Sequence, residues 1–214
     1  MTRPPYVRSQ SETSPQRSFV SAGANPLTDA LAWSGLKSMK DSLLPAYQLS
    51  QEGGLIKDKA VLTGLSYGSL LSGITLAHAG LGSVHGLASP LGAFFPIPHG
   101  IVCGTLASAA AKVNIQALQK RDVYSAALEK YARVGLLLSG KDPHDLKSQE
   151  ARLDVLIEIL SDWTEQMNLP RLNQYGIKES DFERITAGAR GNSMKTNPVI
   201  LSDEEIKTIL KERL

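Results

Sequence analysis

Two histidines, His85 and His99, are the residues of this chain whose type and spacing best suit chemistry. They lie 14 positions apart, on either side of a bend rich in proline and glycine. Neutral imidazole is a common ligand for iron and zinc, and the bend could bring both rings onto one ion. Because a metal site usually needs three or four protein ligands, a second interpretation stays open, in which two buried, hydrogen-bonded histidines hold the bend.

Other residues capable of chemistry are predicted to have structural roles. Gly80 and Gly82 interrupt any helix that would align His78 with the histidine pair, and His144 lies in the polar segment KDPHD, which is typical of a surface loop. Cys103 falls in the apolar run IVCGTLASAAA, where we expect a small buried apolar side chain. No serine or cysteine forms a recognisable nucleophile arrangement with a histidine, so no catalytic residue is assigned.

The composition is that of a globular protein. Of the 214 residues, 42% are hydrophobic and 21% are charged, and the net charge is +2. That charge and an aromatic content of 6% argue against a nucleic-acid partner. The longest apolar stretches are broken by Gly, Ser, His and Lys, so we expect no transmembrane helix and no membrane partner. A single cysteine cannot form an internal disulfide and favours a reducing compartment, which predicts a cytoplasmic protein.

Helical periodicity predicts an all-α, multi-helix bundle over residues 18–214, after an irregular lead over residues 1–17. Asn25-Pro26 is typical of a helix start, and Pro45 should end or kink the helix that follows. The mixture of glycine, proline and apolar residues at 80–100 predicts a buried loop or a set of short helical turns. Further helices are expected at 55–79, 101–118, 121–139, 149–167, 178–190 and 202–213, the last with a capping box formed by Ser202 and Glu205.

No pattern in the chain predicts a nucleotide site. Strands and helices do not alternate as in a nucleotide-binding parallel sheet. The run Gly80-x-Gly82-x-x-x-Gly86 misses the dinucleotide-binding spacing by one residue, and no strand precedes it. These glycines are therefore expected to allow close packing, and no cofactor-binding residue is assigned.

Three segments together resemble the iron-containing alcohol dehydrogenases of the dehydroquinate synthase-like superfamily. GLGSVHGLASPLGAFFPIPHG, at 80–100, resembles the histidine signature of that family. SMKTNP, at 193–198, with the LSDEEI helix after it, resembles the family's C-terminal end. FVSAGANPLTDAL, at 19–31, resembles the segment after the first two metal ligands. The chain is most similar to a divergent branch that ends in SMKxNP.

The resemblance implies a two-domain enzyme. In the family, an N-terminal α/β domain binds NAD(P), and a C-terminal helical domain holds a divalent metal, iron or zinc. The metal polarises the oxygen of a small alcohol or carbonyl substrate during hydride transfer. This chain is similar only to the C-terminal domain, so we expect the nucleotide-binding domain to be absent from it.

Position by position, His85 and His99 match the last two of four family metal ligands. The first two, an Asp and a His, would fall at Gln10 and Ser14, and Ser89 stands where the family often has a further His. Because neither Gln nor Ser replaces those ligands well, weak metal binding is expected. Two functions follow: an oxidoreductase domain that acts with a separate nucleotide-binding domain, or a non-catalytic truncated remnant or helical interaction protein.

Overall fold

The computed structural model describes residues 15–53 and 57–214, and these residues form helices and no strand, which confirms the predicted all-α bundle. The α-helices are α2 (Pro15–Phe19), α3 (Pro26–Gln51), α4 (Lys59–Ala79), α5 (Ser83–Phe94), α6 (His99–Thr105), α7 (Ala107–Arg121), α8 (Ala126–Ser139), α9 (Gln149–Gln166), α10 (Phe182–Gly188), α11 (Asn192–Lys195) and α12 (Asp203–Glu212). Two short 3-10 helices, η2 (Leu172–Tyr175) and η3 (Glu179–Asp181), lie between α9 and α10.

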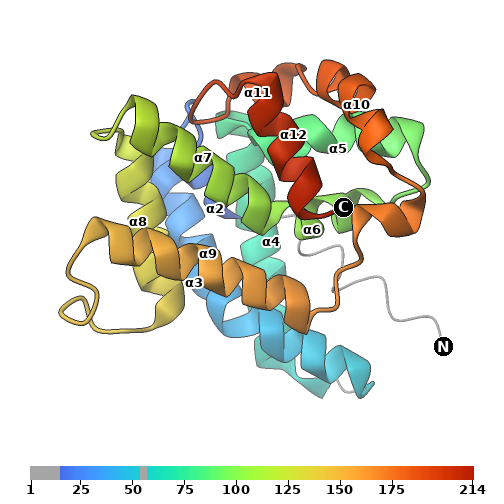
Figure 1. Ribbon diagram of the computed structural model, residues 1–214. Helices are drawn as coiled ribbons and strands as arrows, with labels where there is room; N and C mark the ends of the chain where they lie inside the picture. Colours follow the sequence, from blue (N-terminus) through green and yellow to red (C-terminus); the bar gives the residue numbers. More distant parts are fainter. Residues whose placement is uncertain (1–14, 54–56) are drawn as a thin grey trace.

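Helix α7 is the centre of the bundle. Its residues Ala110 and Val113 belong to one apolar cluster, formed with α5, α6, α10 and α12, whereas its residues Ile115 and Leu118 belong to a second, formed with α2, α3, α8 and α9. In Figure 1, α8 and α9 lie on one side of α7, and α5, α10 and α12 lie on the other. A helix that is apolar on opposite faces must be buried, and α7 joins the two halves of the core for this reason.

Helix α3 starts as predicted and continues beyond Pro45. The Asn25 side chain accepts hydrogen bonds from the backbone N–H groups of Leu27 and Thr28, and Pro26 follows the cap. The helix then continues through Pro45 to Gln51, so of the two predicted outcomes at Pro45 the ending is wrong and the kink stays a prediction. Its neighbour Ala46 is buried in an apolar cluster, and the carbonyl that Pro45 cannot bond belongs to the exposed residue Asp41. Packing of α3 therefore outweighs the lost hydrogen bond.

Residues 80–100 are more regular than predicted. Helix α5 occupies twelve of them, and α6 begins at His99 rather than at Ile101. Pro90 lies inside α5 and is buried against α10, where a Cβ on Gly188 would lie 2.9 Å from the Cβ of Pro90. A proline at this position costs one helix hydrogen bond but gives the helix a rigid apolar contact with α10.

Two helix starts also differ from the sequence prediction. Helix α2 begins at Pro15, so the last three residues of the predicted irregular lead, 15–17, are helical and buried; residues 1–14 lie outside the described part of the chain. Polar composition concealed this helix, because its burial depends on contacts with distant segments. Helix α8 begins at Ala126, five residues later than predicted, because α7 extends to Arg121 and the Ser125 side chain caps α8 by accepting from Ala127 N.

By length and apolar composition alone, α4 could cross a membrane, as could α6 and α7 if that bent pair is counted as one span. Buried helices of soluble proteins meet the same criteria. Helix α4 packs closely along α3, because a Cβ on Gly68 would lie 2.6 Å from Met39 Cγ. The small residues of α4 thus allow this close helix contact, and the absence of a membrane partner stays a prediction.

The predicted capping box at α12 is present and offers a test of the helix boundary. The Ser202 hydroxyl accepts from Glu205 N at 3.3 Å, and the Glu205 carboxylate accepts from Ser202 N at 2.8 Å. We expect Ser202→Ala to lower the free energy of unfolding by about 1 kcal/mol in urea denaturation, since one backbone N–H loses its partner. The control Ser66→Ala, at an exposed position inside α4, should not destabilise, because alanine is the better helix former. Equal stability of Ser202→Ala and the wild type would contradict this role.

Candidate metal centre

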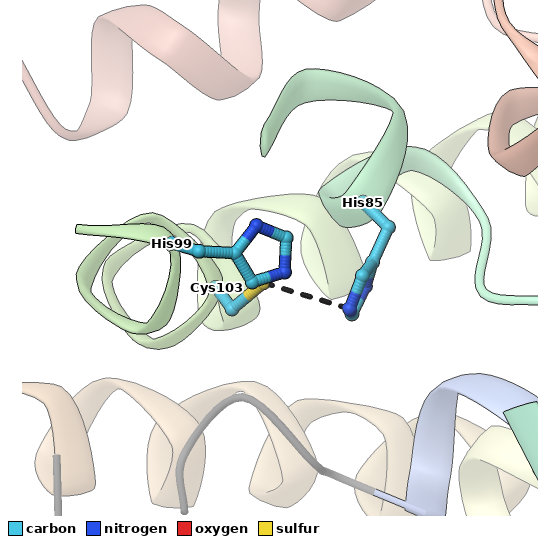
Figure 2. A group of neighbouring side chains, drawn as sticks. All are labelled: His85, His99 and Cys103. Carbon is cyan, nitrogen blue, oxygen red and sulfur yellow. Dashed lines mark hydrogen bonds between the residues drawn. The ribbon is translucent and has the colours of Figure 1, made fainter. Parts of the chain in front are cut away.

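Three side chains meet where α5 and α6 approach each other, as Figure 2 shows. Cys103 Sγ lies 3.7 Å from His85 Nε2 and 3.5 Å from His99 Nε2. One potential ligand atom from each of the three residues lies within 4.8 Å of the others, and the two imidazole centroids are 5.2 Å apart. The structure therefore brings together the two histidines that the sequence singled out and adds a thiol between them.

Local structure fixes these positions. His99 and Cys103 are four residues apart on α6 and so share one face of that helix. The segment between α5 and α6 contains two prolines around Ile97, which is buried, and this anchor turns α6 back toward α5. His85 lies in the first turn of α5, where Ser83 N donates a hydrogen bond of 2.9 Å to the Asn197 side chain. The site thus depends on contacts between segments that are far apart in sequence.

The site is closed on one side and open on the other. Cys103 is fully buried, His85 is half-buried, and His99 is exposed. Burial, followed by the positive charge of Arg17 and by His99, lowers the pKa of His85 to about 3. His85 is therefore neutral at physiological pH, which is the form of imidazole that binds metals.

Sequence reasoning missed two residues at this site. Cys103 is buried as expected, but its thiol contacts both imidazoles. The four-residue spacing between His99 and Cys103 on a helix is the signal that could have revealed this contact. Arg17 lay in the predicted irregular lead and gave no signal. Its Nη1 lies 3.4 Å from His85 Nδ1, and its Nη2 donates a 2.6 Å hydrogen bond to the Cys103 carbonyl oxygen.

The other candidate residues lie apart from the site. His78 is exposed on α4, where the sequence predicted a structural role, and His144 is exposed between α8 and α9, as the sequence predicted. Ser89 is exposed on α5 and is not one of the three grouped residues. Gln10 and Ser14 lie outside the described residues.

The glycines before α5 serve packing, as predicted. Gly80 and Gly82 have φ angles of +77° and +73°, which glycine adopts without strain. A Cβ on Gly82 would lie 2.9 Å from Asn197 Oδ1, and Thr196 Oγ1 accepts a hydrogen bond from Leu81 N at 3.1 Å. The SMKTNP segment is therefore packed directly against the start of the histidine-bearing helix.

Comparison with known proteins identifies the family. The family model described as "Fe-containing alcohol dehydrogenase family, C-terminal" matches residues 17–214. The chain belongs to the iron-containing alcohol dehydrogenase family. This confirms the resemblance drawn from the three sequence segments, and the matched region includes both histidines and Cys103.

Individual members of the family give the extent of the match. "Alcohol dehydrogenase 4" of Saccharomyces cerevisiae is 32% identical over 197 residues, which cover 91% of this chain and 46% of that protein. "1,3-propanediol dehydrogenase" of Citrobacter freundii is 28% identical over 91% of this chain and 46% of its own length. A crystal structure of 1,3-propanediol oxidoreductase superposes with a TM-score of 0.80 at 26% identity and covers 95% of this chain and 50% of that one. The chain thus spans about half the length of these iron-containing alcohol dehydrogenase relatives.

Proposed function

We propose that this chain forms the metal-holding helical half of an alcohol dehydrogenase, which transfers hydride between a small alcohol or carbonyl compound and NAD(P). The observation that carries the proposal is the meeting of His85, His99 and Cys103 at a site open to solvent. Imidazole and thiolate are both ligands for zinc, and imidazole also suits iron, so the chemistry of the donor set fits a divalent metal. The chemistry that such an ion supplies when bound is Lewis acidity toward the substrate oxygen.

The chain's own residues have distinct tasks in this proposal. His85, held neutral by burial, can present a lone pair on one ring nitrogen without releasing a proton to solvent. Buried Cys103 closes the rear of the site against water, and exposed His99 leaves the front accessible to a substrate. The residues described here contain no strand that could present a phosphate-binding loop. We therefore assign NAD(P) binding to an α/β domain outside these 214 residues. The single cysteine supports a cytoplasmic location for the protein.

An alcohol oxidation assay tests the proposed function. The chain alone, with zinc or iron, NAD or NADP and short primary alcohols or diols, should show no turnover, because no group places the nicotinamide against the substrate. Addition of a separately expressed nucleotide-binding half from a relative should give turnover that His99→Ala abolishes. If gel filtration shows that the two halves associate and turnover is still absent, the proposed function is wrong.

A second candidate function, a non-catalytic helical protein, is favoured by one observation. The guanidinium of Arg17 lies within hydrogen-bonding distance of His85, and a fixed positive charge at this position opposes a divalent cation. Under this alternative the two histidines and the cysteine stabilise the contact between α5 and α6 without binding an ion. The two candidates differ in whether His99→Ala changes turnover in the assembled protein or only stability.

A further inference from the structure

We infer that Cys103 is the anionic ligand of a three-ligand cation site, completed by His85 Nε2 and His99 Nε2, that selects a zinc-like ion over a hard, oxygen-preferring one. The inference rests on the proposed function and goes beyond it, because it names the third ligand and the class of metal. The sequence offered two imidazoles only, which is fewer than a metal site usually needs. The structure supplies the third donor from the next turn of α6.

The distances between donor atoms agree with tetrahedral coordination. Zinc–nitrogen distances of about 2.0–2.1 Å and zinc–sulfur distances of about 2.3 Å place a nitrogen and a sulfur about 3.6 Å apart at tetrahedral angles. The two Sγ–Nε2 distances here are 3.5 and 3.7 Å. The two sulfur–nitrogen distances therefore already match two edges of a tetrahedron around such an ion.

The fourth corner of the tetrahedron is accessible. His99 is exposed, whereas Cys103 is buried, so the site reaches the protein surface at His99. Catalytic zinc sites have three protein ligands and one position left for water or substrate, whereas structural zinc sites have four protein ligands. The thiol must lose its proton on binding: the Sγ–H bond breaks, the bond from Sγ to the ion forms, and the proton leaves to the buffer.

The donor set also determines which ions can bind. A thiolate and two imidazoles suit zinc and cobalt, whereas magnesium requires oxygen ligands. One thiolate compensates one of the two positive charges of the ion. The family is named for iron, whereas the ligands of this chain indicate a preference for zinc.

Arg17 competes with this cation. Arginine can only donate hydrogen bonds, so its contact with His85 Nδ1 requires the lone pair on Nδ1 and leaves the ring proton on Nε2, facing Cys103. An ion bound at Nε2 moves that proton to Nδ1, and the hydrogen bond from Arg17 is lost. Removal of the arginine charge should therefore tighten ion binding by about tenfold or more, because two like charges no longer approach each other.

Cobalt(II) titration of the purified, metal-free full chain tests the site without any assay of activity. We expect one cobalt per chain, with the near-ultraviolet charge-transfer band of a thiolate-to-cobalt bond. Since Cys103 is the single cysteine of the chain, that band has one possible source. Zinc should displace the cobalt and bleach the band, and a large excess of magnesium should not.

Matched variants separate the ligands from their surroundings. Cys103→Ser and Cys103→Ala should both lose the band and weaken cobalt binding by at least about 100-fold, the upper end of what loss of an outer-shell partner costs. His78→Ala removes an exposed histidine outside the site and should leave the titration unchanged. Arg17→Met should keep the band and raise the affinity.

Two results would overturn the inference. The first is cobalt binding by the wild type without a charge-transfer band, and the second is undiminished affinity for cobalt in both Cys103 variants. Either result would show that the cysteine is not a ligand. Neither result would contradict the proposed function, which the dehydrogenase assay tests separately. Failure of that assay with an intact cobalt band would instead reject the proposed function and keep the metal site. Unchanged or weaker binding in Arg17→Met would show that the ion does not contact His85 through Nε2.

Discussion

Replacement of Gly135 by alanine should lower the free energy of unfolding by about 3 kcal/mol or more, at the upper end of the range for overpacked cores. Gly135 lies on α8 where this helix crosses α9. A Cβ there would overlap the carbonyl oxygen of Arg152 and lie 3.0 Å from its carbonyl carbon and 3.1 Å from Leu156 Cβ. These atoms belong to the backbone and the first side-chain carbon of a long helix, so they cannot rotate away. The two helices must separate instead, and the packing between them is lost.

A matched glycine gives the control for this experiment. Gly73 lies inside α4, is exposed, and has no atom within 4 Å of the position that a Cβ would occupy. Gly73→Ala should therefore stabilise the protein by up to about 1 kcal/mol, because alanine has the higher helix propensity. Opposite signs for the two glycine variants in urea denaturation would support the close contact of α8 with α9. A Gly135→Ala protein as stable as the wild type would contradict it.

The fold class was predictable because helices depend on local signals. The capped start of α3 at Asn25 and the capping box of α12 at Ser202 lie within four residues of the groups they bond, so the sequence alone reveals them. Pro45 shows where local signals leave two outcomes open, an ending or a kink. Its effect on α3 depends on whether the flanking residues pack against distant segments, and the burial of Ala46 cannot be read from neighbouring residues.

The candidate site was only partly predictable for the same reason. His85 and His99 were found through their spacing and through resemblance to the family, which both operate on sequence. Arg17 reaches the site from 68 residues before His85, and its contact with Cys103 O spans 86 residues. Such contacts arise when α2 packs against α3, α4 and α8 and brings Arg17 beside α5 and α6. No local pattern predicts which side chain of a short polar segment will face inward.

The stability of the fold should also depend strongly on Asn197, which belongs to the SMKTNP segment and is buried. Its Oδ1 accepts hydrogen bonds from Ser83 N at 2.9 Å and from Asn114 Nδ2 at 3.2 Å. Its Nδ2 donates to Asn114 Oδ1 at 2.8 Å and to the Val199 carbonyl oxygen at 2.7 Å. One amide group therefore joins α5, α7 and the C-terminal segment, and the Ser83 contact holds the turn that carries His85.

Asn197→Ala should lower the free energy of unfolding by about 3 kcal/mol, because it leaves the buried Ser83 N–H and Asn114 Oδ1 without the partners that Asn197 supplies. The cost stays below the sum of four separate bonds, since the cavity of about 20 Å³ lined by Asn197 and Asn114 has room for one water that can replace part of the amide. Asn192→Ala, at the exposed residue directly before that segment, should change stability by less than about 0.5 kcal/mol. In a double-mutant cycle with Asn114→Ala, we expect a coupling energy above about 1 kcal/mol, measured by urea denaturation. Additive effects of the two variants would show that the amide pair does not join the C-terminal segment to α7.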